Sequence, residues 1–176
     1  WIRQFADSVS AAVQSGAYPQ GIAQLQSLDS QVAQVGGADY AYVQFRLMTA
    51  RYGDSLRKSP EKFDAVQEKW LVDLGAFVKK FPSSGDAPEA IFQLAIAEEF
   101  VGSFERAIAY YGEIVSKYPK APIVPKAEGA RRRLNLKDKP LALVSQSLGG
   151  QQIDTRRFNG RIVVIHYWAS WSDPST

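Results

Sequence analysis

Apolar residues recur every three or four positions through residues 1–135, the spacing that places side chains on one face of an α-helix. Glycine and proline interrupt this pattern, which marks turns between the helices. The apolar stripes run through residues 2–12, 22–32, 63–78, 91–101 and 107–115, and the interruptions are Gly16, Gly36, Gly37, Pro82, Gly102 and Pro119. The first three quarters of the chain are therefore predicted to be a succession of amphipathic helices.

One helix start is marked by its own residues. The sequence Ser59–Pro60–Glu61 matches the start of a helix. Serine is favoured at the N-cap, proline at the first helical position and an acidic residue in the first turn. A further helix near 123–134 is expected to close the helical region.

The helical region repeats itself. Residues 15–28 (SGAYPQGIAQLQSL) align with residues 101–114 (VGSFERAIAYYGEI), 86 positions later. Residues 74–82 (LGAFVKKFP) align separately with residues 111–119 (YGEIVSKYP), 37 positions later. Both matches end on the same segment, which indicates a stack of helical hairpins that bury their apolar faces on one another.

Residues 88–121 resemble one tetratricopeptide repeat. The residues at the consensus spacing are Ile91, Leu94, Ala95, Gly102, Phe104, Ala107, Tyr111, Ile114 and Pro119, whereas Glu98 replaces the usual aromatic residue of the first helix. Small Ala95 and Ala107 allow close helix approach, Gly102 allows the turn and Pro119 stops the second helix. Residues 2–35 fit the template more loosely, and in the unit of about 38–82 only the second helix matches.

The resemblance implies a mainly α fold over residues 1–136, with about three antiparallel hairpins and a closing helix. It also implies a surface that holds a protein or peptide partner. Tyr40, Tyr42 and Tyr52 are expected either to line such a groove or to fill space between helices.

The helical spacing of apolar residues ends after Leu136. Residues 137–140 (KDKP) are predicted to be a linker, because Pro140 disfavours a helix before it. Residues 141–147 and 151–155 are predicted to be two short strands joined by a turn at Gly149–Gly150. The continuous apolar run 162–169 (IVVIHYWA) is typical of a central strand that is buried on both faces.

Residues 158–175 resemble the active-site region of thioredoxin-like proteins of the TlpA/ResA type. The matching stretch is FNGR, then IVVI, then YWASW and SDPS. The resemblance covers about 36 residues, 141–176, and implies that they are the N-terminal fragment of a thioredoxin-like domain. It places Trp171, Ser172, Pro174 and Ser175 at the catalytic motif, with the two serines where the family has its cysteines.

Those serines cannot perform the family's chemistry. A cysteine at a helix N-terminus is a reactive thiolate that attacks a disulfide, and the second cysteine resolves the mixed disulfide. The hydroxyl of Ser172 or Ser175 stays protonated near neutral pH and forms no S–S bond, and the chain contains no cysteine. The paired change to the nearest isostere favours engineered substitution over natural loss.

Other chemistry at this end of the chain has less support. Ser172 lacks the Gly-x-Ser-x-Gly setting of a hydrolase nucleophile, and the single histidine, His166, lies inside the predicted strand. His166 also has no clustered partner for a metal site, so it is expected to be a core or sheet residue. No metal and no cofactor are predicted.

Charge is distributed unevenly along the chain. Residues 1–116 carry 10 Lys and Arg against 14 Asp and Glu, and residues 117–176 carry 11 against 4. Clustered cations are able to bind nucleic acid or anionic lipid, but no nucleic-acid motif accompanies them here. A solvated helix end followed by a polar linker is the preferred interpretation, and no nucleic-acid partner is predicted.

Two functional hypotheses follow. The first is a redox-inactive piece of an exported bacterial thiol–disulfide oxidoreductase, whose parent acts on disulfide-bearing proteins in the periplasm or cell envelope, as the resemblance implies. The second is a non-enzymatic scaffold that binds a peptide or protein through its repeats and carries a vestigial redox tail. In either case the apolar strand predicted at 162–168 would need to be shielded from solvent by another part of the chain or by a second copy. We expect the strands to pack on their own helices or, preferably, to pair with a second copy in a homodimer.

Overall fold

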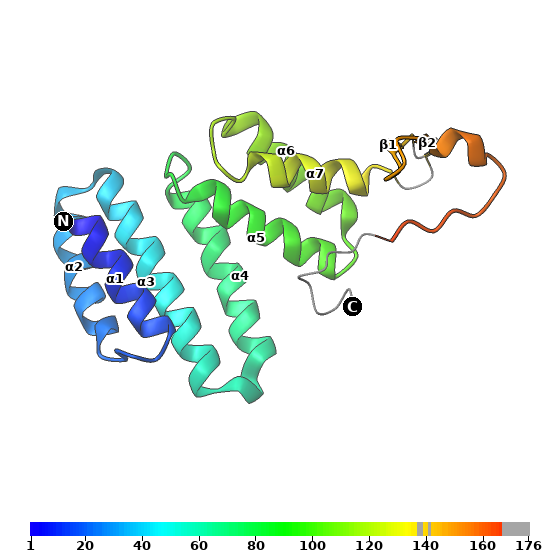
Figure 1. The fold of residues 1–176 in the computed structure, drawn as a ribbon. Coiled ribbons are helices and arrows are strands. Elements are labelled where there is room, and N and C mark those ends of the chain that lie inside the picture. Colours follow the sequence, from blue (N-terminus) through cyan, green and yellow to red (C-terminus); the bar gives the residue numbers. More distant parts are fainter. Residues whose placement is uncertain (137–138, 141, 167–176) are drawn as a thin grey trace. The chain divides into compact units, whose positions relative to one another are not determined.

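The computed structural model describes residues 1–136, 139–140 and 142–166, and it divides into two compact units, of which the first is Trp1–Leu134. The described residues of the first unit form seven α-helices (Figure 1). The helices are α1 (Ile2–Gln14), α2 (Gly21–Val35), α3 (Gly37–Lys58), α4 (Phe63–Lys80), α5 (Ala87–Phe100), α6 (Phe104–Lys117) and α7 (Val124–Leu134). The predicted mainly α class, with a small β element near the C-terminal end, is confirmed.

Three hydrophobic cores hold the helices together, and each core joins three successive helices. The first lies among α1, α2 and α3, the second among α3, α4 and α5, and the third among α5, α6 and α7. Helices α3 and α5 therefore each contribute to two cores, which is how a stack of helical hairpins buries its apolar faces.

The two faces of α3 show how the sequence achieves this. Val43 and Leu47, four residues apart, lie in the first core. Phe45 belongs to the second core, and Met48 and Tyr52 pack against it. Because side chains three or four positions apart share a helix face, these two sets form separate stripes on α3.

The hairpin of α5 and α6 is closely packed. Ala95 and Ala107 are both fully buried, so their small side chains let the two helices approach each other. Gly102 has φ +79° in the turn between them, a conformation that favours glycine. Glu98, at the position of the usual aromatic residue, forms an ion pair with Arg106 at 2.7 Å.

The start of α4 differs in detail from the sequence prediction. A short 3₁₀ helix, Pro60–Lys62, precedes α4, and the side chain of Ser59 makes no capping hydrogen bond. The backbone carbonyl of Ser59 instead accepts a hydrogen bond from the backbone N–H of Lys62 at 3.0 Å. The tight turn therefore begins at Pro60 as predicted, but the regular α-helix begins three residues later.

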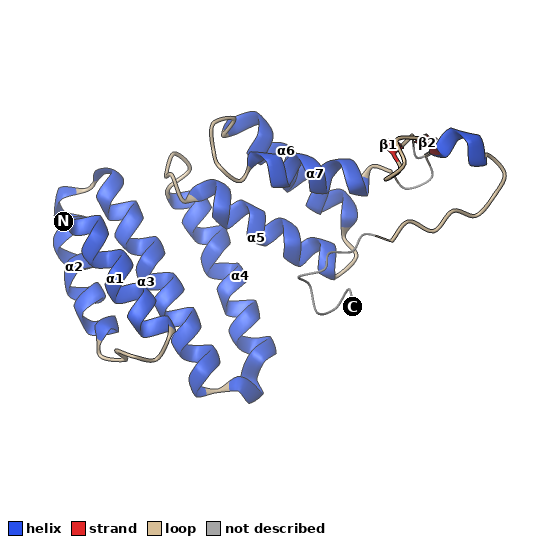
Figure 2. Cartoon of the chain, in the orientation of Figure 1, coloured by secondary structure: helices blue, strands red, loops and turns tan. Residues whose placement is uncertain are grey.

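The second unit contains a two-stranded antiparallel sheet, drawn in red in Figure 2. Strand β1 (Val144–Gln146) pairs with β2 (Gln152–Asp154), with Ser145 opposite Ile153. A 3₁₀ helix, Thr155–Phe158, follows, and the side chain of Asp154 accepts a hydrogen bond from the N–H of Arg156. The predicted strand pair around the Gly149–Gly150 turn is therefore present.

The central strand predicted at 162–168 is not formed in its described part. Residues 162–166 adopt no regular secondary structure, and Ile162 and Val164 are 98% and 87% exposed. A strand requires a neighbouring strand for its N–H and C=O groups, and the sheet in the described residues contains only β1 and β2. The apolar run alone was insufficient to predict a buried strand here.

Candidate binding groove between α3 and α4

The sequence-predicted redox residues Trp171, Ser172, Pro174 and Ser175 lie outside the described residues. His166 is described and is exposed, so the expectation of a core or sheet histidine was wrong. The strand that would have enclosed it is absent over residues 162–166.

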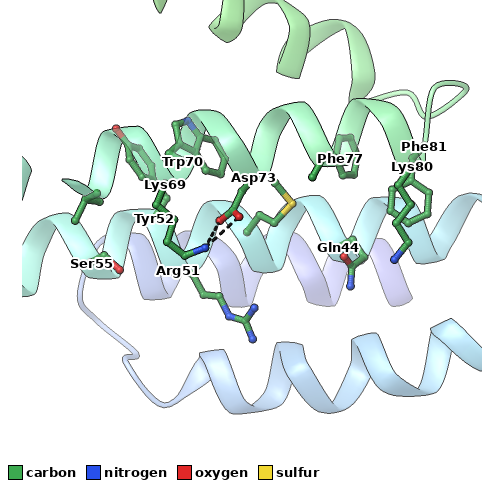
Figure 3. Close-up of a pocket in the computed structure, with 13 residues that line it drawn as sticks. Gln44, Arg51, Tyr52, Ser55, Lys69, Trp70, Asp73, Phe77, Lys80 and Phe81 are labelled. Atoms are coloured by element: carbon green, nitrogen blue, oxygen red, sulfur yellow. Dashed lines mark hydrogen bonds and ion pairs between the residues drawn. The ribbon is translucent and has the colours of Figure 1, made fainter. Parts of the chain in front are cut away.

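An open groove of about 340 Å³ runs between α3 and α4 (Figure 3). Helix α3 contributes residues from Gln44 to Ser55, and α4 contributes residues from Val66 to Lys80. Eleven steps of 1.5 Å give the α3 wall a length of roughly 16 Å. The groove is lined by Gln44, Met48, Arg51, Tyr52, Ser55, Val66, Lys69, Trp70, Asp73, Ala76, Phe77, Lys80 and Phe81.

A stacked aromatic pair joins the two walls of the groove. The rings of Tyr52 and Trp70 lie 4.6 Å apart with an interplanar angle of 16°. Tyr52 donates its hydroxyl hydrogen bond to Gln67 at 2.5 Å, and Trp70 donates from Nε1 to Gln93 of α5 at 3.0 Å. Since both polar groups have partners within the protein and Trp70 is 5% exposed, the pair forms a rigid part of the groove wall.

The rim of the groove carries more positive than negative charge. Lys69 and Asp73 form an ion pair at 2.8 Å, one helical turn apart on α4. Within the part of the chain that the structure describes, the side chain of Arg51 makes no hydrogen bond or ion pair. Figure 3 shows Arg51 extending from α3 away from α4.

Lys80 marks the end of the groove nearest the start of α3. Its amine donates a hydrogen bond to the hydroxyl of Tyr40 at 2.8 Å and lies 4.9 Å from the ring centre of Phe81. Lys80 and Phe81 also line a second hollow, of about 640 Å³, beside the first turn of α3 and the loop before α5. Tyr40 and Tyr42 line this second hollow, and Tyr52 lines the groove while also packing between helices.

An ion cluster fixes α3 beside the second hollow. Arg46 pairs with Asp7 of α1 at 2.6 Å and with Asp86, which precedes α5, at 2.9 Å. The hydroxyl of Tyr42 donates to both carboxylate oxygens of Asp7 at 2.7 Å. Partial burial acts to raise the pKa of Asp7, but the hydrogen bonds from Tyr42 and Arg46 outweigh it and lower that pKa.

The sequence interpretation identified Tyr52 as a candidate groove residue but not Trp70, Met48, Arg51 or Lys80 as groove residues. The internal repeat carried a usable signal. At the offset of 37 positions, Trp70 aligns with Ala107, so a large ring stands where the closely packed hairpin has a methyl group. A position of this kind indicates a place where two helices are held apart.

The described residues hold no group of three or more acidic, histidine or cysteine side chains arranged to bind a metal ion. None of the described helices has the length and the apolar composition that crossing a bilayer requires. No family model, curated protein or solved structure matches this chain.

Proposed function

We propose that the helical unit is a binding scaffold that holds a segment of a partner protein in the groove between α3 and α4. The observation that carries this proposal is the groove itself, an open hollow with apolar walls and a polar rim. Sites that bind ligands combine these features, because apolar area supplies affinity and a few polar groups supply specificity.

The walls of the groove support recognition of a side chain rather than of a bare backbone. Met48 and Val66 supply flexible or branched apolar contacts, and Phe77 is 97% buried within the second core, against which Met48 packs. Methionine adapts its shape to different ligands, whereas the Tyr52–Trp70 stack is held by hydrogen bonds. An apolar side chain of a ligand that entered the groove would be shielded from water by both helices.

A groove-filling substitution tests the proposal. Ala76 is exposed and lines the groove, so Ala76→Trp fills the space without entering a core. A displayed library of random peptides of about 12 residues, long enough as a helix to span about 18 Å, is selected on the full chain. We expect recovered peptides to bind the wild-type protein at least tenfold more tightly than Ala76→Trp.

Val72→Trp is the matched control, because Val72 lies on the same helix, is 65% exposed and does not line the groove. This variant is expected to bind the recovered peptides as the wild-type protein does. Equal binding by wild-type and Ala76→Trp protein would show that the groove is not the binding site.

A second candidate function concerns the parent of this chain. We propose that residues 141–176 are a piece of a thioredoxin-like domain and that the parent is an exported thiol–disulfide oxidoreductase. The proposal is supported by the sequence resemblance over 158–175 and by a strand pair, β1 and β2, directly before that stretch. Cysteine codons at positions 172 and 175 of the natural gene are the expected result, and serine codons there would contradict the redox role.

A further inference from the structure

We propose that the segment held in the α3–α4 groove is acidic and amphipathic, with a large apolar side chain flanked by carboxylates. This inference rests on the proposed binding function and specifies the chemistry of its partner. It follows from the charges that line the groove, the freedom of those charges to bind, and the apolar surface between them.

The groove differs in charge from the part of the chain that contains it. Three cations, Arg51, Lys69 and Lys80, and one carboxylate, Asp73, line it, a net charge of +2. Residues 1–116 as a whole carry 10 basic and 14 acidic side chains, a net charge of −4. The positive charge therefore belongs to the groove and is not a property of the surrounding sequence, and it favours an anionic occupant.

The charges that remain available are the cations. Asp73 is neutralised by Lys69 at 2.8 Å, so this pair contributes no net charge to the rim. The side chain of Arg51 makes no hydrogen bond or ion pair with the described residues, and its planar guanidinium fits a carboxylate with two hydrogen bonds. The amine of Lys80 uses one donor on Tyr40 and retains others for a ligand.

The positions of these cations define where the carboxylates of the ligand would lie. Arg51 lines the groove from α3 on the side away from α4 (Figure 3), whereas Lys80 lies at the end of the groove beside Phe81. Met48 lines the groove from α3, three residues before Arg51 and toward the start of that helix, and Figure 3 shows Phe77 between these two regions. A ligand with an apolar residue over Met48 and acidic residues on both sides matches this order.

A single-stranded nucleic acid is the competing class of anionic partner. Such ligands stack their bases on accessible aromatic rings. Trp70 is only 5% exposed and its ring is stacked on Tyr52, so it offers little open ring surface. The groove therefore favours a peptide, and an oligonucleotide serves as a competitor in the test.

The test uses the peptides recovered on the full chain and lost on Ala76→Trp. We expect these peptides to contain an excess of Asp and Glu next to a large apolar residue. The most frequent peptide is then synthesised in two forms, one as selected and one with every Asp and Glu changed to Asn and Gln. The amide form is expected to bind the wild-type protein at least tenfold more weakly.

Variants of the protein assign that preference to the groove. Arg51→Glu is expected to weaken binding of the acidic form at least tenfold and to leave the amide form within about threefold, because it removes one charge-assisted contact and adds a carboxylate that repels those of the ligand. Lys79→Glu is the matched control, because Lys79 is an exposed cation on α4 that does not line the groove. Lys79→Glu is expected to change binding of either form by less than about threefold, since exposed charges act weakly at a distance.

Each contrary outcome has a distinct meaning. Groove-dependent peptides without an acidic excess, or amide forms that bind as tightly as acidic forms, would overturn this inference and leave the binding scaffold intact. Displacement of the acidic peptide by a 12-residue oligothymidylate at lower concentration than by unlabelled peptide would also overturn it, in favour of nucleic acid. An absence of any groove-dependent peptide would overturn both the scaffold and the inference.

Discussion

The α3–α4 and α5–α6 hairpins occupy equivalent places in the internal repeat but are packed differently. In α5–α6, the fully buried Ala95 and Ala107 allow the helices to meet closely. In α3–α4, Trp70 stands at the position equivalent to Ala107 and stacks on Tyr52 of the facing helix. The hairpin that contains the groove thus has a large ring where the closely packed hairpin has a methyl group.

This difference shows why a departure from a repeat pattern is informative. Residues that match the repeat, such as Tyr111 and Ile114, are buried and hold the helices together. The unit that fits the repeat least well, residues 38–82, is the one that contains the groove. Changes in the two hairpins, and in the contacts that hold α3 in place, should therefore differ in their effect on stability, and the largest loss is expected at Trp70.

Removing the large ring should cause the greatest loss of stability. Trp70→Ala deletes a side chain that is 5% exposed, together with its stack on Tyr52 and its hydrogen bond to Gln93. We expect the free energy of unfolding to fall by about 3–5 kcal/mol, as for other buried aromatic-to-alanine changes. Chemical denaturation measures this loss, with Val72→Ala on the exposed side of α4 as the control; a loss below about 1 kcal/mol would show that Trp70 does not hold the hairpin.

Enlarging an alanine should affect the two hairpins differently. Ala107→Leu adds bulk to a fully buried site and is expected to cost about 1–3 kcal/mol of unfolding free energy through overcrowding. Ala76→Leu adds the same atoms in the open groove and is expected to change stability by less than about 0.5 kcal/mol. Thermal or chemical unfolding of both variants tests the contrast, and equal losses would mean that the groove is not open in solution.

The ion cluster on α3 should make stability depend on pH. The pKa of Asp7 lies below the ordinary value of 3.8, so its contribution is fully present above about pH 4 and is lost as the pH falls through the lowered pKa. Arg46→Met removes one of the two donors that lower this pKa, so the variant should lose less additional stability between about pH 6 and pH 3. The difference is expected to be at most about 1 kcal/mol, because the Asp7 side chain is half exposed.

Urea unfolding of both proteins at the two pH values measures that difference. Gln44→Met serves as a control on the same helix, since Gln44 hydrogen-bonds Asp29 rather than Asp7. Identical pH dependence in the wild-type protein and Arg46→Met would show that Arg46 does not contribute to the pH dependence of stability.

The smallest effect is expected at the rim. Lys69→Ala breaks an exposed ion pair with Asp73, in which the lysine side chain is 74% exposed, and should change the free energy of unfolding by less than about 0.5 kcal/mol. Lys117→Ala breaks the corresponding type of pair with Glu113 on α6 and should have the same small effect. A loss above 1 kcal/mol at either site would show that the ion pair stabilises the fold more than an exposed pair ordinarily does.

The sequence by itself determined most of the helical architecture. Helical spacing of apolar residues, with Gly102 and Pro119 between or after helices, was sufficient to predict the α5–α6 hairpin and the closing helix α7. The turn residues Gly149 and Gly150 were sufficient to predict the β1–β2 pair. These features depend on interactions between residues close in sequence, which is why a local pattern specifies them.

Only the tertiary structure decided which candidate surface is open and which apolar run is paired. The groove requires Met48 and Trp70, from separate helices, to lie on facing walls with space left between those walls. The run 162–166 has a strand-like composition, yet a strand forms only when a partner satisfies its backbone, and the described sheet contains only β1 and β2. Both outcomes depend on contacts between distant residues, and composition along the chain does not encode which of those contacts are made.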